Sequence, residues 1–139
     1  MNAHVLNTIS RRLSLRPPQA ESLARLGRML QAAPELLDHE GAIEGRNLPA
    51  ILATLKAELP TLEDFEREFP SLCFALATGV GKTRLMGAFI AYLHLAHGIN
   101  NFFVLAPNLT IYNKLITDFT PNTPKYVFKG IAEFAQQPP

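Results

Sequence analysis

Apolar residues recur at helical spacing in the first half of the chain. Prolines 17 and 18 suit the first turn of a helix, whose N–H groups have no intrahelical acceptor, and we predict this helix from Pro17 to about Gln31. Asn47 is the expected N-cap of a second helix. The apolar stripes of the two helices are Ala20, Leu23, Leu26 and Leu30, and then Leu48, Ile51, Leu52, Leu55 and Leu59.

A third helix is expected just before the middle of the chain. Thr61-Leu62-Glu63-Asp64 has the composition of a capped helix start, and Leu62, Phe65 and Phe69 would face inward until Pro70 stops the helix. Residues 1–70 are therefore expected to form an N-terminal helical segment.

Short apolar runs alternate with helical patterns after Pro70. Residues 72–77 and Asn101–Ala106 are predicted as strands, and Lys125–Phe128 as a third, short strand. Helices are predicted at 82–97, ending at Gly98, and at 109–119, with the stripe Leu109, Tyr112, Leu115, Ile116 and Phe119. Strands alternating with helices are typical of an α/β fold with a parallel sheet and right-handed crossovers. We assign residues 71–139 to this part, with the apolar 82–97 helix packed between layers.

A glycine-rich turn lies between the first predicted strand and the helix that follows it. It has the sequence Ala77-Thr78-Gly79-Val80-Gly81-Lys82-Thr83, and we call it the phosphate loop. Gly79 and Gly81 permit torsions that turn successive N–H groups inward, and the helix start offers partial positive charge to the same anion. Lys82 can reach the β and γ phosphates, and the Thr83 hydroxyl can ligate Mg²⁺. The pattern G-x-x-x-x-G-K-[ST] is broken at its first position by Leu76.

Composition adds little to this picture. The chain of 139 residues has 13 basic and 12 acidic residues, so its overall charge gives no argument for a polyanionic partner. Cys73 is expected to be a small buried hydrophobe. The N-terminus lacks a charged segment followed by an apolar stretch, and no apolar run approaches the ~20 residues of a membrane span. We expect a cytoplasmic protein of one domain at most.

Three segments together resemble the start of a superfamily-two helicase motor, in particular the Res subunit of type III restriction enzymes and related DEAD/DEAH-box proteins. They are Leu15-Arg16-Pro17-Pro18-Gln19, Ala77-Thr78-Gly79-Val80-Gly81-Lys82-Thr83-Arg84 and Val104-Leu105-Ala106-Pro107-Asn108-Leu109-Thr110. The resemblance implies an adenine-reading glutamine motif, motif I and motif Ia, in that order. It also implies a RecA-like P-loop NTPase sheet, here incomplete, with ATP and Mg²⁺ as cofactors and DNA as partner.

The first segment brings a candidate base reader. The Gln19 amide can pair with both a donor and an acceptor on the adenine edge. The spacing alone does not distinguish an adenine-reading Gln19 from an exposed glutamine on a helix. Arg16 could stack on the base or merely solvate a helix start, and the residues favour neither. In the second segment Thr78, Val80 and Arg84 complete the expected nucleotide-binding set, with Lys82 and Thr83 as its catalytic members.

The third segment brings candidate contacts to a nucleic-acid backbone. Asn108, Leu109 and Thr110 lie just past the carboxyl end of a predicted parallel strand, where open sheets bind ligands. Asn108 serves equally well as the cap of the helix that follows. Lys114 could add a phosphate contact, but solvated helical lysines are common.

Two features limit the function that can be expected. His94 and His97 have no carboxylate or cysteine at ligand spacing, so a zinc site is not expected. A motor of this family needs an acidic pair, D-E-x-H, to hold Mg²⁺ and orient water, and the chain contains no Asp-Glu dipeptide. The residues therefore look like the N-terminal part of a longer enzyme, inactive alone, whose remaining motor domains and a methyltransferase subunit would be its partners.

Two other functions stay open. A small phosphotransferase could use the same loop, but it needs an arginine-rich lid, and three arginines lie before the loop instead, at Arg11, Arg12 and Arg16. A non-catalytic fragment that binds nucleotide weakly, or not at all, is the other alternative.

Overall fold

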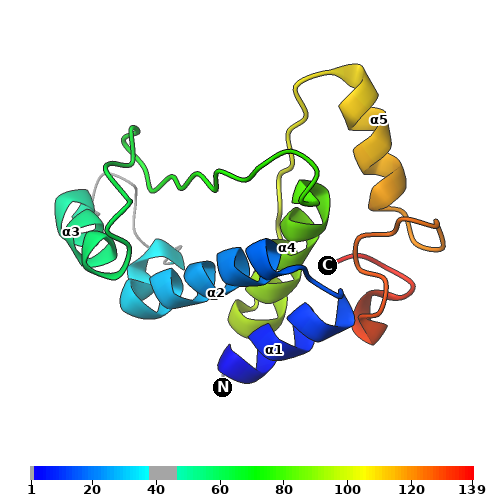
Figure 1. Cartoon of the computed structure of the whole chain (residues 1–139), viewed down its shortest axis with the longest axis horizontal. Coiled ribbons are helices and arrows are strands. Elements are labelled where there is room, and N and C mark those ends of the chain that lie inside the picture. Colours follow the sequence, from blue (N-terminus) through cyan, green and yellow to red (C-terminus); the bar gives the residue numbers. More distant parts are fainter. Residues whose placement is uncertain (1, 38–46) are drawn as a thin grey trace. The chain divides into compact units, whose positions relative to one another are not determined.

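The computed structural model describes residues 2–37 and 47–139, and its regular elements there are helices. The α-helices are α1 (Asn2–Arg12), α2 (Pro17–Ala32), α3 (Leu48–Glu58), α4 (Lys82–His97) and α5 (Leu109–Asp118) (Figure 1). Short 3-10 turns are η1 (Pro34–Leu37) and η3 (Ala132–Phe134). The helices predicted from residues 17, 48, 82 and 109 are confirmed.

The chain divides into two compact units. One contains Met1–Leu23 and Leu76–Pro139, and the other contains Ala24–Ala75. These bounds differ from the division at residue 70 expected from the sequence. The phosphate loop and the first turn of α2 fall in the same unit, which is the arrangement on which the candidate site depends.

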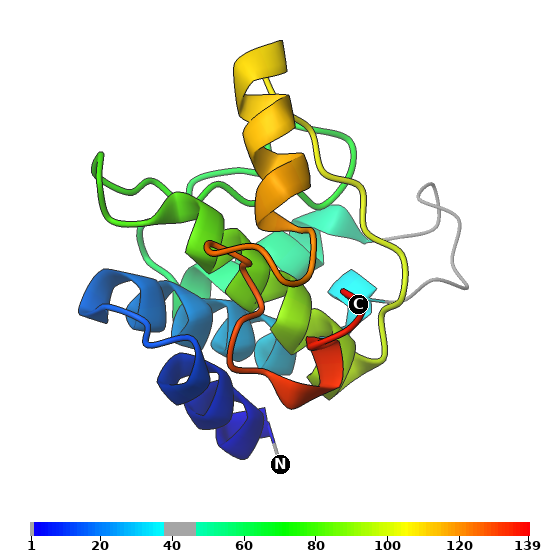
Figure 2. The ribbon, with the colours of Figure 1, turned by 90° about the vertical axis from the view of Figure 1, so that its right-hand side faces the viewer.

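Helix α4 is the central element of the first unit. Its buried residues are Leu85, Gly87, Ala88, Ile90, Ala91 and Tyr92. Helix α1 packs against α4, and Figures 1 and 2 show the two side by side. The C-terminal segment also reaches α4, since a Cβ added at Gly87 would lie 3.0 Å from the Val127 Cβ. The apolar sequence of α4 is thus explained by burial against a helix and a C-terminal segment.

Helix α1 was not predicted from the sequence. Val5, Ile9 and Leu13 recur four residues apart, which is the spacing of one helical face, and Ile9 is fully buried. The end of α1 is tied to the C-terminal segment by a hydrogen bond of 3.3 Å from Arg12 Nη1 to the Gly130 carbonyl oxygen. This helix therefore contributes to the core of the unit that holds the phosphate loop.

The second unit has a small apolar core of its own. It includes Leu26, Met29, Leu30, Ala33, Ile51, Leu55 and Phe65. Helix α3 begins as predicted, with the Asn47 side chain accepting a hydrogen bond of 3.3 Å from the Ala50 N–H.

The helix predicted from Thr61 to Phe69 is wrong. The Asp64 carboxylate accepts the Phe65 N–H at 2.7 Å, and the Ser71 hydroxyl donates to the Phe65 carbonyl oxygen at 2.6 Å. Both backbone groups of Phe65 are therefore bonded to side chains, which competes with helix formation. Glu66 has a φ of 58°, which lies outside the right-handed helical region.

The predicted α/β fold with a RecA-like parallel sheet is wrong for this structure, because the described residues contain no strand. Residues 72–77 and 101–106 run outside helices, and no backbone hydrogen bond in the described part joins them to a neighbouring strand. Residues Lys125–Phe128 form turns, with Tyr126, Val127 and Phe128 buried. An apolar run becomes a strand only where a partner takes its N–H and C=O groups.

Several apolar residues of the 101–106 run and of α5 are exposed. Phe103 is 88% exposed and Leu105 is 76% exposed. Three members of the apolar stripe predicted on α5 are exposed too, namely Leu109, Tyr112 and Ile116. Cys73, expected to be buried, is also exposed. The helix predicted at 109–119 is confirmed as Leu109–Asp118, and three of the five residues of its apolar stripe are exposed.

Candidate nucleotide-binding site

The phosphate loop has the backbone conformation that its glycines allow. Gly79 and Gly81 have φ angles of 82° and 84°, in the left-handed region that favours glycine. Gly81 is the N-cap of α4 and has no side-chain capping bond. The first N–H groups of α4, beginning with Lys82, thus lack a side-chain acceptor and can serve an anion.

Gln19 joins the start of α2 to this loop. Its Oε1 accepts the Arg16 N–H at 2.8 Å, which is the glutamine half of a capping box at the start of α2. Its Nε2 donates to the Gly81 carbonyl oxygen at 2.8 Å. The side chain is only 2% exposed, so the interpretation of Gln19 as an exposed helical glutamine is wrong. Nε2 has a second N–H and Oε1 has a second lone pair, so the amide can pair with a base once the base reaches this buried side chain.

Two arginines also hold the loop and its helix. Arg16 Nη1 donates to the Gly79 carbonyl oxygen at 3.2 Å. Arg84 Nη1 donates to the Leu13 carbonyl oxygen at 2.8 Å, just past the end of α1. Together with Gln19, these bonds fix the loop against the segment that contains residues 13–19.

The loop and this segment enclose a cavity of about 240 Å³. Its lining residues are Ser14, Arg16, Gln19, Gly79, Val80, Gly81 and Arg84. Two guanidinium groups and no carboxylate are among them, so the cavity favours an anion. Its position beside the α4 N-terminus suits a phosphate group.

The expected catalytic residues lie at the edge of this arrangement. Lys82 is exposed, and within the described residues it makes no hydrogen bond or ion pair, so its ammonium is available to a ligand. Thr83 is half-buried and Thr78 is exposed. The structure therefore brings Gln19 together with the phosphate loop, as the resemblance implied, and adds Arg16 and Ser14 to the set.

The expected nucleic-acid residues lie at the start of α5. Asn108 is its N-cap, with Oδ1 accepting the Ile111 N–H at 3.0 Å, and Leu109 and Thr110 are exposed. The Asn108 Nδ2 group remains a possible donor. Lys114 forms an ion pair with Asp118 at 2.6 Å on the same helix, which uses one of the three N–H donors of its ammonium. No described hydrogen bond links residues 108–110 to the phosphate loop.

The two histidines of α4 bond within the protein. His94 Nδ1 lies 2.9 Å from the Ile99 carbonyl oxygen, and His97 Nε2 lies 3.3 Å from the Tyr92 hydroxyl. Burial lowers the pKa of His97 and raises that of Tyr92. The pair therefore belongs to the packing around the end of α4.

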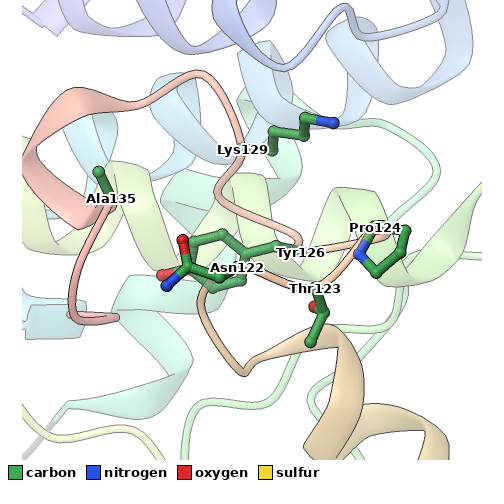
Figure 3. Close-up of a pocket in the computed structure, with 6 residues that line it drawn as sticks. All are labelled: Asn122, Thr123, Pro124, Tyr126, Lys129 and Ala135. Carbon is green, nitrogen blue, oxygen red and sulfur yellow. The ribbon is translucent and has the colours of Figure 1, made fainter.

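A second cavity, of about 380 Å³, lies in the C-terminal segment (Figure 3). It is lined by Asn122, Thr123, Pro124, Tyr126, Lys129 and Ala135. The Tyr126 hydroxyl donates to the Phe134 carbonyl oxygen at 2.6 Å, and Figure 3 shows Lys129 extending away from Asn122 and Tyr126. The lining of this cavity contains one charged residue, Lys129, against two arginines at the phosphate loop, so the phosphate loop is the better candidate for an anion site.

Comparison with known proteins identifies a family for this chain. The family model described as type III restriction enzyme, res subunit, matches residues 12–138. No curated protein and no solved structure gives a significant match. The helices of the described part include none long and apolar enough to cross a membrane.

Proposed function

Because the chain belongs to the type III restriction enzyme Res subunit family, we propose that it is the ATP-binding portion of an ATP-dependent DNA helicase or translocase. A helicase-like, ATP-dependent function is what the family as a whole implies. Our proposal goes beyond the family in three respects. It names ATP as the ligand, DNA as the nucleic acid on which the enzyme moves, and a role for each residue of the site.

The observation that carries this proposal is the cationic cavity beside the phosphate loop. Left-handed glycines, an α4 N-terminus without a side-chain cap and two arginines surround the same space. In the proposed complex, the backbone N–H groups of residues 79–84 hold the phosphates. Lys82 neutralises charge on the β and γ phosphates, and Thr83 ligates Mg²⁺.

The base would lie on the side of the loop where α2 begins. We propose that Gln19 reads adenine with the second N–H of Nε2 and the second lone pair of Oε1, once the base reaches this buried side chain. The bonds to the Arg16 N–H and to the Gly81 carbonyl oxygen would keep the amide oriented. Thr78 and Val80 complete the ligand-facing side of the loop.

DNA is the proposed macromolecular partner. The exposed start of α5 supports this, because Asn108 and Thr110 offer polar groups and a helix N-terminus to a phosphate. The remaining motor domains of a longer parent chain, and a modification methyltransferase subunit, are proposed as protein partners from the family alone.

ATP binding is the direct test. The ¹⁵N-labelled chain is titrated with MgATP while its backbone amide signals are followed, a method that detects millimolar affinities. We expect the signals of residues 79–84 to shift and those around Asn122 and Lys129 to remain in place. Shifts confined to the C-terminal cavity would overturn the proposal.

A non-catalytic nucleotide-binding fragment is the second candidate. It is favoured by one observation, that no carboxylate is among the residues that line the cavity. Without such a group, the metal and the attacking water have no acidic partner. Binding of ATP without turnover in the full-length parent would support this candidate over the motor.

A further inference from the structure

We infer that Arg16 is a positioning residue for the phosphate loop, which it serves by setting the direction of one peptide group. The inference rests on the proposed function, because it concerns the same anion site. The residue had two earlier interpretations, stacking on the base and solvation of a helix start.

The geometry of the Gly79–Val80 peptide carries this inference. A trans peptide is planar, so its C=O and N–H groups point in opposite directions. Arg16 Nη1 holds the Gly79 carbonyl oxygen at 3.2 Å, and glycine restricts its own ψ angle little, so this peptide can turn if the bond is lost. Holding the carbonyl oxygen therefore also holds the Val80 N–H on the other side.

Gln19 acts in a parallel way on a second peptide. Its Nε2 donates to the Gly81 carbonyl oxygen, which also accepts the Leu85 N–H at 3.2 Å, and the two bonds together hold the N–H of Lys82 at the start of α4. The Gln19 Oε1 in turn accepts the Arg16 N–H. The two donors are thus connected, and both come from the first turn of α2. Successive N–H groups held in this way form the concave anion site that a phosphate needs.

An arginine suits this task for two reasons. Its guanidinium carries several donors in a rigid plane, so one can hold the carbonyl oxygen while others line the cavity. Lysine keeps the charge but provides a single flexible ammonium. Lysine at position 16 should therefore hold the Gly79–Val80 peptide only in part, and methionine should not hold it at all.

The test compares three probes on the ¹⁵N-labelled chain: tripolyphosphate, ATP and GTP, each with Mg²⁺. We expect Arg16→Met to weaken the binding of all three about equally, by roughly three- to tenfold, which corresponds to one net hydrogen bond. In the ligand-free chain, the Val80 amide signal should shift and its hydrogen exchange should quicken. Arg16→Lys should lie between Arg16→Met and wild type.

Arg11→Met is the matched control, since it removes a positive charge from the exposed end of α1 without touching the loop. It should leave the Val80 signal and all three affinities nearly unchanged. Thermal unfolding of both variants should stay close to wild type, because Arg16 is exposed.

The outcomes separate the possible roles of Arg16. A loss for ATP and GTP with tripolyphosphate unaffected would overturn positioning and indicate stacking on the base. Unchanged binding of all probes by Arg16→Met would overturn it as well and leave a solvated arginine. If the wild-type chain binds none of the probes, the proposed function fails and the positioning role fails with it.

Discussion

The Nε2 group of Gln19 donates to the Gly81 carbonyl oxygen at 2.8 Å, so one buried amide joins the first turn of α2 to the N-cap of α4. The two residues are 62 positions apart in the chain. A substitution at either residue should therefore disturb the position of the other. Gly79 has no such neighbour, because nothing lies within 4 Å of a Cβ added there.

Replacing Gly81 by alanine should displace Gln19. The new Cβ would meet Gln19 Nε2, and alanine would also be strained at a φ of 84°. The strain alone costs about 1–2 kcal/mol. Gly79→Ala is the matched control, since its φ is 82° but nothing lies within 4 Å of its Cβ. Thermal unfolding should show the larger loss for Gly81→Ala, and equal losses would argue against a rigid Gln19 contact.

Discrimination between ATP and GTP should depend on Gln19. A buried amide that pairs with adenine leaves polar groups unpaired when the base is wrong, at roughly 1–3 kcal/mol each. Gln19→Ala should therefore weaken ATP binding more than GTP binding. Titration of both proteins with both nucleotides measures the difference. An equal loss for the two nucleotides would restrict Gln19 to its observed role in holding the loop.

Nucleotide turnover should depend on Lys82. Its ammonium is exposed and makes no bond within the described residues, so Lys82→Ala should leave folding intact. In the full-length parent, ATPase activity should fall to background, because the mobile cation at the β and γ phosphates is lost. Lys56→Ala in α3 provides a control at an exposed helical lysine outside the loop. Near-normal turnover by the Lys82→Ala protein would remove this residue from the site.

The 139-residue chain alone should bind nucleotide weakly and hydrolyse none. Its cavity has no carboxylate among the lining residues to orient metal and water. Purified chain incubated with ATP, Mg²⁺ and single- or double-stranded DNA provides the assay. DNA-stimulated turnover that is lost in Lys82→Ala would contradict this expectation and would require an acidic group from another source.

Folding stability should decrease in mild acid because of His97. Burial lowers the pKa of His97 in the folded chain below its usual 6.5, so the unfolded chain binds the proton first as the pH falls. This contribution to stability is complete above pH 6.5 and is lost as the pH falls from there through the lower folded pKa. Denaturant unfolding between pH 8 and pH 5 measures the slope. His97→Gln should reduce it, whereas His4→Gln, at an exposed position of α1, should not.

Helices α2, α3, α4 and α5 were predicted at the right positions because the signals at their ends are local. Asn47 and Asn108 cap the helices they were expected to cap, and Gly98 ends α4 in a left-handed conformation. A cap acts within three or four residues, so its chemistry is visible in the sequence itself.

Strands could not be predicted in the same way. The apolar pattern of residues 101–106 fits a buried strand, yet pairing depends on a second segment that the pattern does not contain. The Thr61–Phe69 segment failed for another reason, since Asp64 and Ser71 bind the backbone of Phe65. Both errors come from interactions that hydrophobic periodicity does not record.

The candidate site was predicted in part. The glycine pattern predicted the phosphate loop, and the resemblance to a family predicted that Gln19 belongs to the same site. The bond from Arg16 to Gly79 spans 63 positions of the chain, and the bond from Arg84 to Leu13 spans 71. Contacts between residues so far apart in the sequence cannot be predicted from local patterns. The cationic character of the cavity follows from these contacts and not from the nearly neutral composition.

The hydrogen bond between Gln19 and Gly81 also closes the chain from residue 19 to residue 81 into a long ring, which includes the unit Ala24–Ala75. The entropy of closing such a ring grows only with the logarithm of its length, so doubling the ring costs about 0.6 kcal/mol. Insertions or deletions inside this unit should therefore be inexpensive for the nucleotide site. Evolution is free to lengthen, shorten or replace the intervening unit while the two ends keep their partners.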